Sequence, residues 1–280
     1  MIYPCIVHGG VSTEKKSIIG GIIFLLLIAG FSGCVGPQVS EHFDESYLVN
    51  EHTILKVINI NGQVEITGWD SRNVTVNAVK HSSFGQEELD KIEIDVTTLG
   101  NYLTIETKYT GSSILQGSVD YDIKVPRNLS IESVTTSNGA ILITNSKGDV
   151  TIQSSNGAIL VDNVNGYVTA QTSNARIEVR NTIGIGDIHT SNGALTIEVA
   201  DIRDNVSIDT SNAAINVYLN SSLNATIEMM TSNNRITIEG ISVNVTLSED
   251  THVLGTLGSN GKRIDIHTSN AKIQLFALES

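Results

Sequence analysis

The chain has 280 residues, a net charge of -13 and a hydrophobic content of 40%, so it can bury one sizeable core. The acidic balance makes nucleic acid and anionic membrane surfaces poor partners. Three prolines and one tryptophan give no sign of a proline-rich linker or an aromatic binding groove. The only cysteines are Cys5 and Cys34, which excludes disulfides and cysteine-type metal sites from the remainder of the chain.

Residues 1–33 resemble a lipoprotein signal peptide. A pair of lysines precedes an uncharged run from Ser17 to Val35, and the run contains Phe-Ser-Gly directly before Cys34. In such a signal a peptidase cuts before the cysteine and a lipid is attached to its sulfur, which predicts lipidation of Cys34. An uncleaved membrane helix over the same run is the alternative. Either anchor places the rest of the chain on the extracytoplasmic face of the cell membrane.

The next segment, residues 34–50, is polar and contains Gly36-Pro37. It predicts a short tether that holds the folded part away from the lipid surface. Residues 51–280 then predict one elongated β-solenoid domain.

The first part of that domain, residues 51–133, predicts an irregular N-terminal cap and the first coils. Val57, Val64 and Ile66 occupy inward positions of a loosely alternating pattern. Further strands are predicted at residues 74–79, 92–96, 102–107 and 119–126, with a brief helical turn at 86–90. Terminal coils of solenoids are usually irregular because they must cap an open edge.

The regular repeats of residues 134–240 carry the clearest signal, a Thr-Ser-Asn-Gly phrase that keeps returning. Its asparagine recurs at steps of 18, 18, 18, 20 and 21 residues, and then of 37, which is close to two periods. This period suits one coil of a parallel β-solenoid. The seven marker asparagines are Asn138, Asn156, Asn174, Asn192, Asn212, Asn233 and Asn270.

The residues around each marker alternate between apolar and variable positions. Isoleucine, leucine or valine stands three and five residues after the marker, and a variable residue stands between them. An apolar residue four positions before the marker is followed two residues later by Thr or Ser. This period of two predicts strands with one buried face, stacked about 4.8 Å apart. Residues 241–280 predict C-terminal coils in which the pattern loosens again.

The marker asparagines are predicted to be structural. They share the parity of the inward residues that precede them, which favours an amide-to-amide ladder pointing into the coil at a corner. The alternative is that asparagine only tolerates a left-handed turn and faces water.

Three phrases in a fixed order carry a family resemblance. They are Asn-Gly-x-Val-Glu-Ile-x-Gly-Trp-Asp at Asn61–Asp70, Tyr-Asp-Ile-x-Val-Pro at Tyr121–Pro126, and then the Thr-Ser-Asn-Gly coils. Over residues 50–280 the chain resembles the DUF4097 putative-adhesin family. The resemblance implies a single-stranded parallel β-helix of right-handed sense, exported or membrane-tethered, and it brings no catalytic residues.

A search for catalytic and metal-binding residues gives no convergent site. Polysaccharide lyases and hydrolases need two or three carboxylates on one outer face, whereas the outward carboxylates stand at different offsets from the markers. They are Glu178, Asp209, Glu198 and Glu228. His189 and His267 share one outward column and are expected to face solvent. No catalytic residue, cofactor or metal site is therefore predicted.

Two function classes remain. The first is a surface binding or structural module without catalysis, anchored to the membrane by its N-terminal lipid or helix, with a glycan or an envelope protein as the expected partner. The second is a polysaccharide-active enzyme with an unrecognised carboxylate site. A regulatory partner in envelope stress is a further alternative.

Overall fold

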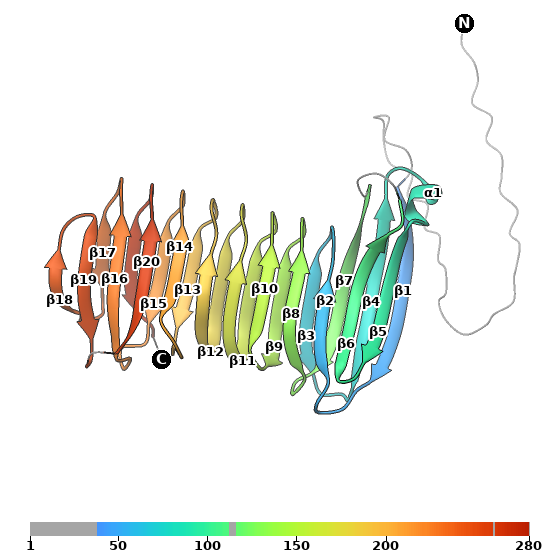
Figure 1. The fold of residues 1–280 in the computed structure, drawn as a ribbon, viewed down its shortest axis with the longest axis horizontal. Coiled ribbons are helices and arrows are strands. Elements are labelled where there is room, and N and C mark those ends of the chain that lie inside the picture. The colour runs from blue at the N-terminus through green and yellow to red at the C-terminus, as the bar shows by residue number, and fades with distance from the viewer. Residues whose placement is uncertain (1–37, 112–115, 260, 280) are drawn as a thin grey trace, which may run out of the picture.

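The computed structural model describes residues 38–111, 116–259 and 261–279, and there the regular secondary structure is almost entirely β-strand. The predicted all-β class is confirmed. The described residues contain 21 strands and one helix of four residues, α1 (Gln86–Leu89). The strands stack side by side into an elongated body (Figure 1). The predicted signal peptide and Cys34 lie outside the described residues.

The strands form three groups along the chain. The N-terminal group is β1 (Val39–Leu48), β2 (Ile54–Ile58), β3 (Val64–Trp69), β4 (Asn73–Ser82), β5 (Ile92–Leu99), β6 (Tyr102–Tyr109) and β7 (Gly117–Pro126). The central group is β8 (Ser130–Thr136), β9 (Ile141–Lys147), β10 (Val150–Ser154), β11 (Ile159–Gln171), β12 (Ile177–His189), β13 (Leu195–Val199), β14 (Val206–Thr210) and β15 (Ile215–Leu219). The C-terminal group is β16 (Ala225–Thr231), β17 (Ile236–Glu239), β18 (Asn244–Ser248), β19 (His252–Leu257), β20 (Lys262–Thr268) and β21 (Ile273–Ala277).

In the central group, strands of successive repeats pair in parallel. We call the strands before and after one marker asparagine, together with the turn between them, a coil. After the marker, β9 pairs with β11, β11 with β12, β12 with β13 and β13 with β15, so that Ile141, Ile159, Ile177, Leu195 and Ile215 are neighbours. Before the marker, β8 pairs with β10, β10 with β11, β11 with β12 and β12 with β14. Residues that stand one sequence repeat apart are therefore register partners in the sheet.

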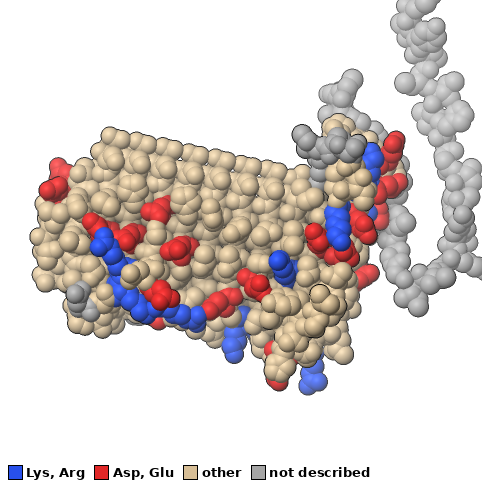
Figure 2. Space-filling view, viewed as in Figure 1, with Lys and Arg blue, Asp and Glu red and all other residues tan. Residues whose placement is uncertain are grey.

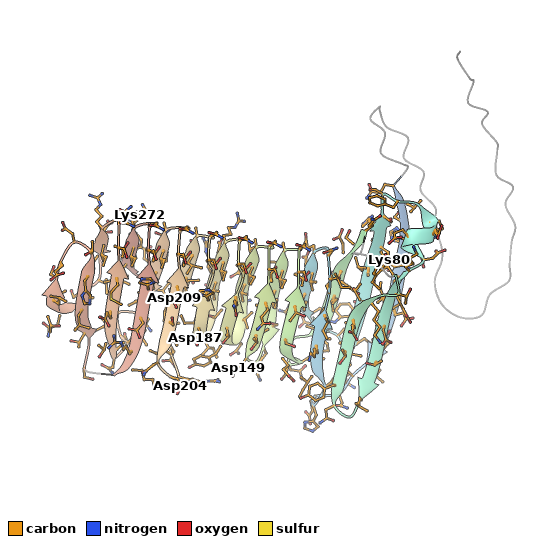
Figure 3. All side chains as sticks on the ribbon, turned by 45° about the horizontal axis from the view of Figure 1, so that its top comes forward. Lys80, Asp149, Asp187, Asp204, Asp209 and Lys272 are labelled. Atoms are coloured by element: carbon orange, nitrogen blue, oxygen red, sulfur yellow. The ribbon has the colours of Figure 1, made fainter. Side chains whose placement is uncertain are left out.

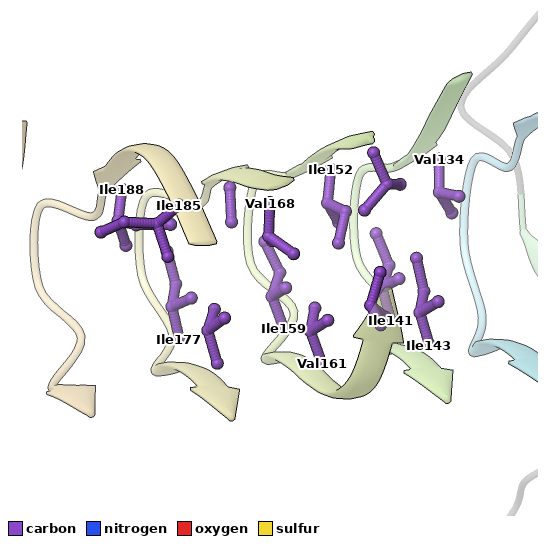
Figure 4. Packing of buried hydrophobic residues seen from close by; sticks show 14 of the residues in the cluster. Val134, Ile141, Ile143, Ile152, Ile159, Val161, Val168, Ile177, Ile185 and Ile188 are labelled. Carbon is purple, nitrogen blue, oxygen red and sulfur yellow. The ribbon is translucent and has the colours of Figure 1, made fainter. Parts of the chain in front are cut away.

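The core consists of the predicted inward columns. Ile141, Ile159 and Ile177 are completely buried, and so are Val134 and Ile152 on the strands before the marker. Figure 4 shows these side chains stacked along the body. Burying one such side chain stabilises the fold by roughly 1.5 to 3 kcal/mol, and because each column continues from coil to coil, neighbouring coils stabilise one another.

The Thr and Ser residues two positions before each marker are buried as well. Thr190 donates a hydrogen bond to the carbonyl oxygen of Ala175 at 3.1 Å and accepts one from the amide of Gly193 at 3.2 Å. Thr210 and Thr268 donate to the carbonyls of Gly193 and Ala213 at 3.0 and 3.1 Å. These hydroxyls satisfy backbone groups at the corner that would otherwise lose their hydrogen bonds on burial.

The N-terminal coils do not follow sequence order. β2 lies between β6 and β8, and β3 lies between β7 and β9, all in parallel pairs. The chain thus passes from β3 outward to the end of the body and returns to β8 beside β2. Antiparallel pairs of β4 with β7, β1 with β4 and β5 with β6 complete this end. The strands and the helical turn lie where the sequence predicts them, but these antiparallel pairings were not predicted.

The predicted tether needs a correction in its second half. Residues Val39–Leu48 form β1, which pairs with β4 along ten residues. Val39, Phe43 and Tyr47 are half-buried against the core, and two glutamates stand between them on the same face of the strand. An apolar residue therefore recurs only at every fourth position, so the segment lacks the period-two alternation by which a strand is recognised in a sequence.

The C-terminal coils also differ from the expected order. β20 lies between β14 and β16, and β21 lies between β15 and β17. The last coil of the chain, residues 262–277, is therefore inserted inside the stack. The far end consists instead of β17 and of the β18–β19 hairpin, whose β19 pairs antiparallel with β16 (Figure 1).

Candidate binding faces

The seven marker asparagines form one continuous ladder. Each side-chain amide donates to the amide oxygen of its neighbour at 2.7 to 2.8 Å. In space the order is Asn138, Asn156, Asn174, Asn192, Asn212, Asn270 and Asn233. Asn61 extends the ladder on the N-terminal side, because Asn138 donates to it at 2.6 Å.

The ladder faces solvent and not the interior of the coil. All seven markers are exposed, so the inward orientation expected from parity is wrong. The buried corner position belongs to the preceding Thr or Ser, and the chain turns between that residue and the marker. None of the markers adopts a positive φ, so the left-handed turn is not their role either. The ladder joins successive coils along an exposed edge.

A second asparagine column, which was not predicted, holds the left-handed positions. Asn145, Asn163 and Asn181 have φ angles of 57°, 54° and 51°, where asparagine is tolerated better than most residues. Asn163 donates to Asn145 at 2.7 Å, and Asn181 donates to Asp162 at 2.7 Å. The 18-residue spacing of the three asparagines is the signal that could have found them.

The predicted outward histidines lie on either side of an aspartate. Asp209 is the register partner of His189 on one neighbouring strand and of His267 on the other, because the last coil is inserted beside β14. The Asp209 carboxylate also accepts a hydrogen bond from the Ser207 hydroxyl. Among residues 38–111, 116–259 and 261–279, no group of three His, Cys, Asp or Glu side chains is placed to hold a metal ion.

An acidic hollow of about 440 Å³ lies on the face formed by the strands before the markers. Four carboxylates line it, those of Glu132, Asp149, Asp187 and Asp204. Figure 3 shows the three aspartates along one side of the stack, and in Figure 2 charged residues gather in a band across the lower half of the face. This gathering of carboxylates was not visible in the sequence, because Glu132, Asp149 and Asp204 lie away from the columns near the marker.

The hollow contains an internal cation held by an aromatic ring. The guanidinium carbon of Arg203 lies 3.8 Å from the centre of the Tyr167 ring, and Arg203 forms an ion pair with Asp149. The Tyr167 hydroxyl donates to Asp201 at 2.5 Å, and this bond is the main reason that the pKa of Tyr167 is raised. Asp149 and Asp187 also accept backbone N–H groups at 2.9 Å. Glu132 interacts with the Tyr102 hydroxyl, so three of the four lining carboxylates are engaged by the protein itself.

The four outward carboxylates, those of Glu178, Asp209, Glu198 and Glu228, do not converge on one site. Glu178 forms an ion pair with Arg180 at 2.8 Å, and Glu198 accepts the backbone N–H of Asn181 at 2.8 Å. Glu228 contacts Arg263 and also His252, the latter at 2.7 Å. Asp209 and Glu228 lie on strands that precede a marker, whereas Glu178 and Glu198 lie on strands that follow one.

An aromatic pair lies on the sheet formed by the strands that follow the markers, although the composition of the chain showed no sign of an aromatic groove. Tyr218 on β15 and Phe276 on β21 are register partners, and their rings stack with centroids 5.0 Å apart and an interplanar angle of 21°. They lie in a hollow of about 480 Å³. This pair could not be predicted from the repeat pattern, because Tyr218 and Phe276 become neighbours only through the insertion of the last coil.

Within the described residues, no helix has the length and apolar character needed to cross a membrane. The predicted anchor, Ser17 to Val35, lies outside that part of the chain.

Comparisons with known proteins give only distant likenesses. No family model and no curated protein matches the chain. The chain is similar to a solved structure of a putative cell adhesion protein from Clostridium sporogenes, with 13% identity, a TM-score of 0.38, and coverage of 85% of this chain and 100% of that one. It is also similar to a putative adhesin from Bacteroides fragilis, with 12% identity, a TM-score of 0.39, and coverage of 84% and 97%. A third similar structure is a putative lipid binding protein from Parabacteroides distasonis, with 12% identity, a TM-score of 0.36, and coverage of 86% and 97%.

Proposed function

We propose that this protein is a non-catalytic binding module of the cell envelope, of the DUF4097 putative-adhesin type. Its folded part is a single-stranded parallel β-helix of right-handed sense, held on the extracytoplasmic face of the membrane by a lipid on Cys34. The parallel pairing of strands one repeat apart supports this architecture.

The observation that carries the proposal is the alignment of outward side chains. Because parallel strands pair in register, the outward residues of successive coils lie in straight columns at the spacing of the ladder, about 4.8 Å. Leu160, Glu178 and Thr196, for example, are consecutive neighbours on one face. Such a face is rigid before any partner arrives, so binding costs little ordering of the protein. The net charge of -13 favours neutral or positively charged partners.

Saturable binding to envelope components tests the module. The full-length chain, reconstituted in neutral vesicles, is incubated with separated polysaccharide and protein fractions of its own cell envelope. We expect saturable binding to one fraction and no release of new reducing ends from the polysaccharide. Absence of saturable binding to every fraction would overturn the proposal.

The competing function, a polysaccharide-active enzyme, has the acidic hollow as its best location. Product release that is lost on replacing Asp187 or Asp204 by Asn, and retained on replacing the distant Glu178 by Gln, would establish it. Because Asp149 and Asp187 already serve internal partners, we expect no product.

Metabolic labelling tests the anchor. If a lipid is attached at Cys34, a fatty acid or isoprenoid precursor should label the chain, and Cys34→Ala should abolish both labelling and cleavage. A wild-type chain that stays at full length and unlabelled would contradict the lipid anchor and favour an uncleaved helix over Ser17 to Val35.

A further inference from the structure

The aromatic pair is enclosed by carboxylates within its own column. On one side Tyr218 pairs with Glu198, and on the other side Phe276 pairs with Glu239. The order along the stack is therefore carboxylate, ring, ring, carboxylate. Glu279, on the segment after β21, lines the same hollow. Both rings are half-buried.

The residues that line this hollow include three carboxylates and no Lys or Arg. Glu198 accepts one backbone N–H, from Asn181, whereas within the described residues no donor contacts the Glu239 carboxylate. Anionic ligands are disfavoured here by charge, and a neutral apolar ligand would leave the carboxylates without a counterion.

The hollow has free space beside Phe276. Gly240 follows β17 and lines the hollow, and a methyl group built on it would meet only the Cβ atom of Ala277, at 3.9 Å. The remaining lining is apolar, from Ala277 and Leu278. A ligand in this space meets an aromatic surface, an aliphatic surface and carboxylates together.

The acidic hollow shows which occupant this combination suits. There the Tyr167 ring and the Asp149 carboxylate hold the guanidinium of Arg203, a cation supplied by the protein. The Tyr218–Phe276 hollow has the same two kinds of group, a ring face and carboxylates, but its lining supplies no cation. Aromatic rings attract cations through the negative potential of their faces, and quaternary ammonium groups are recognised in this way.

We propose that the hollow formed by Glu198, Tyr218, Glu239, Gly240, Phe276 and Leu278 binds an organic cation with an apolar body, of the quaternary ammonium class. The inference rests on the proposed function, because it identifies the kind of group on an envelope partner that the module recognises. The outer face of Phe276, which the stacked Tyr218 ring does not cover, contacts the methyl groups of the cation, and Glu239 provides the countercharge.

Calorimetric titration of the full-length chain in a maltoside detergent tests this assignment. The probes are choline, its neutral isostere 3,3-dimethyl-1-butanol, and glucose. We expect choline to bind at least tenfold more tightly than the isostere, and glucose not to bind. Phe276→Leu should weaken choline binding at least tenfold, and Glu239→Gln several-fold. Glu178→Gln, which removes a carboxylate on the same ladder outside the hollow, should leave the affinity unchanged.

A purely structural role of the ring pair predicts a different result. In that case Phe276→Leu lowers the melting temperature, while choline and its isostere bind equally or not at all. That result overturns the assignment, and so does an equal loss of choline binding in Glu178→Gln. If envelope binding persists unchanged in Phe276→Leu, the proposed module stands and only the cation site is wrong. If choline binds as expected but no envelope fraction does, the site stands and the proposed function fails.

Discussion

The central coils and the two ends of the stack differ in how their coils are connected. Between β8 and β13, neighbours in space are neighbours in sequence, one repeat apart. At the N-terminal end the coil of β2 and β3 lies between later coils, and at the C-terminal end the coil of β20 and β21 lies between two earlier ones.

This difference shows how the body closes its ends. A stack in which every coil follows the previous one ends in a coil that is held on one side only. Here the last coil in sequence is held on both sides, and the exposed ends are completed by antiparallel strands such as β1 and β18. The stability of each end therefore depends on segments that are far apart in the chain. The insertion also creates the column of Glu198, Tyr218, Phe276 and Glu239.

The largest effect is expected from removing the inserted coil. Deleting residues 262–280 removes four buried apolar side chains, Ile264, Ile266, Ile273 and Leu275, each worth roughly 1.5 to 3 kcal/mol. It also separates β14 from β16 inside the stack. The summed loss approaches the whole stability of a typical domain. We therefore expect that thermal unfolding, measured by circular dichroism, is no longer cooperative.

Deleting the central repeat 156–173 provides the matched control. The deletion keeps every column in register, because it removes one period of 18 residues, and we expect a folded, shorter stack. The comparison between the two regions fails if both deletions are equally harmful, or if the chain without residues 262–280 melts like the wild type.

The next effect contrasts two adjacent residues of a central coil. Ile177 is completely buried, so Ile177→Asp places an unpaired carboxylate in the core and should cost about 4 kcal/mol or more. Glu178 points outward and has a surface ion pair with Arg180, so Glu178→Lys should cost no more than about 1 kcal/mol. Chemical denaturation measures both, and similar losses would mean that the assignment of faces is wrong.

A smaller effect concerns the N-terminal end at high pH. Burial raises the pKa of Tyr121 to about 12, and its hydroxyl lies 2.7 Å from that of Thr107. In the unfolded chain tyrosine ionises near pH 10, so the unfolded state loses the proton first. Folding stability should therefore fall as the pH rises from about 10 to about 12. Tyr121→Phe should flatten this fall, and an unchanged slope would contradict the burial argument.

The smallest effect is expected in the exposed asparagine ladder. Asn174 donates to Asn156 and accepts from Asn192, so Asn174→Ala removes two solvent-exposed hydrogen bonds and should cost about 1 kcal/mol. Asn163→Gly should cost less, because glycine readily adopts the left-handed conformation of that position. The melting temperatures of the two variants provide the test, and a larger loss at Asn163 would reverse the roles of the two columns.

The sequence predicted the features that repeat and missed those that depend on connectivity. The inward columns, for example Ile159 and Val161, follow from local alternation, which each strand shows on its own. The solvent-facing side of the markers could not be read from parity, because the chain turns a corner between Thr172 and Asn174. The Asn163 column was recognisable by its spacing alone.

The order of the coils in the stack could not be predicted from the repeat pattern, for a physical reason. Every coil presents nearly the same apolar columns, so the pattern does not specify which coil pairs with which. The step of 37 residues between Asn233 and Asn270 is equally compatible with one missing marker in a sequential stack. The gathering of Asp149, Asp187 and Asp204, and the pairing of Tyr218 with Phe276, depend on features that the marker columns do not contain.

Engineered disulfides test the inserted coil most directly. In a chain whose two native cysteines are replaced by serine, the double variant Asn212→Cys/Asn270→Cys joins residues whose side-chain amides lie 2.7 Å apart, in the turns of two adjacent coils whose spacing suits a disulfide. Asn212→Cys/Asn233→Cys joins residues that would be neighbours only in a stack that follows the sequence. We predict rapid, complete disulfide formation in the first pair and none in the second, measured by thiol titration of the folded protein. Disulfide formation in the second pair and not in the first would contradict the insertion of the last coil.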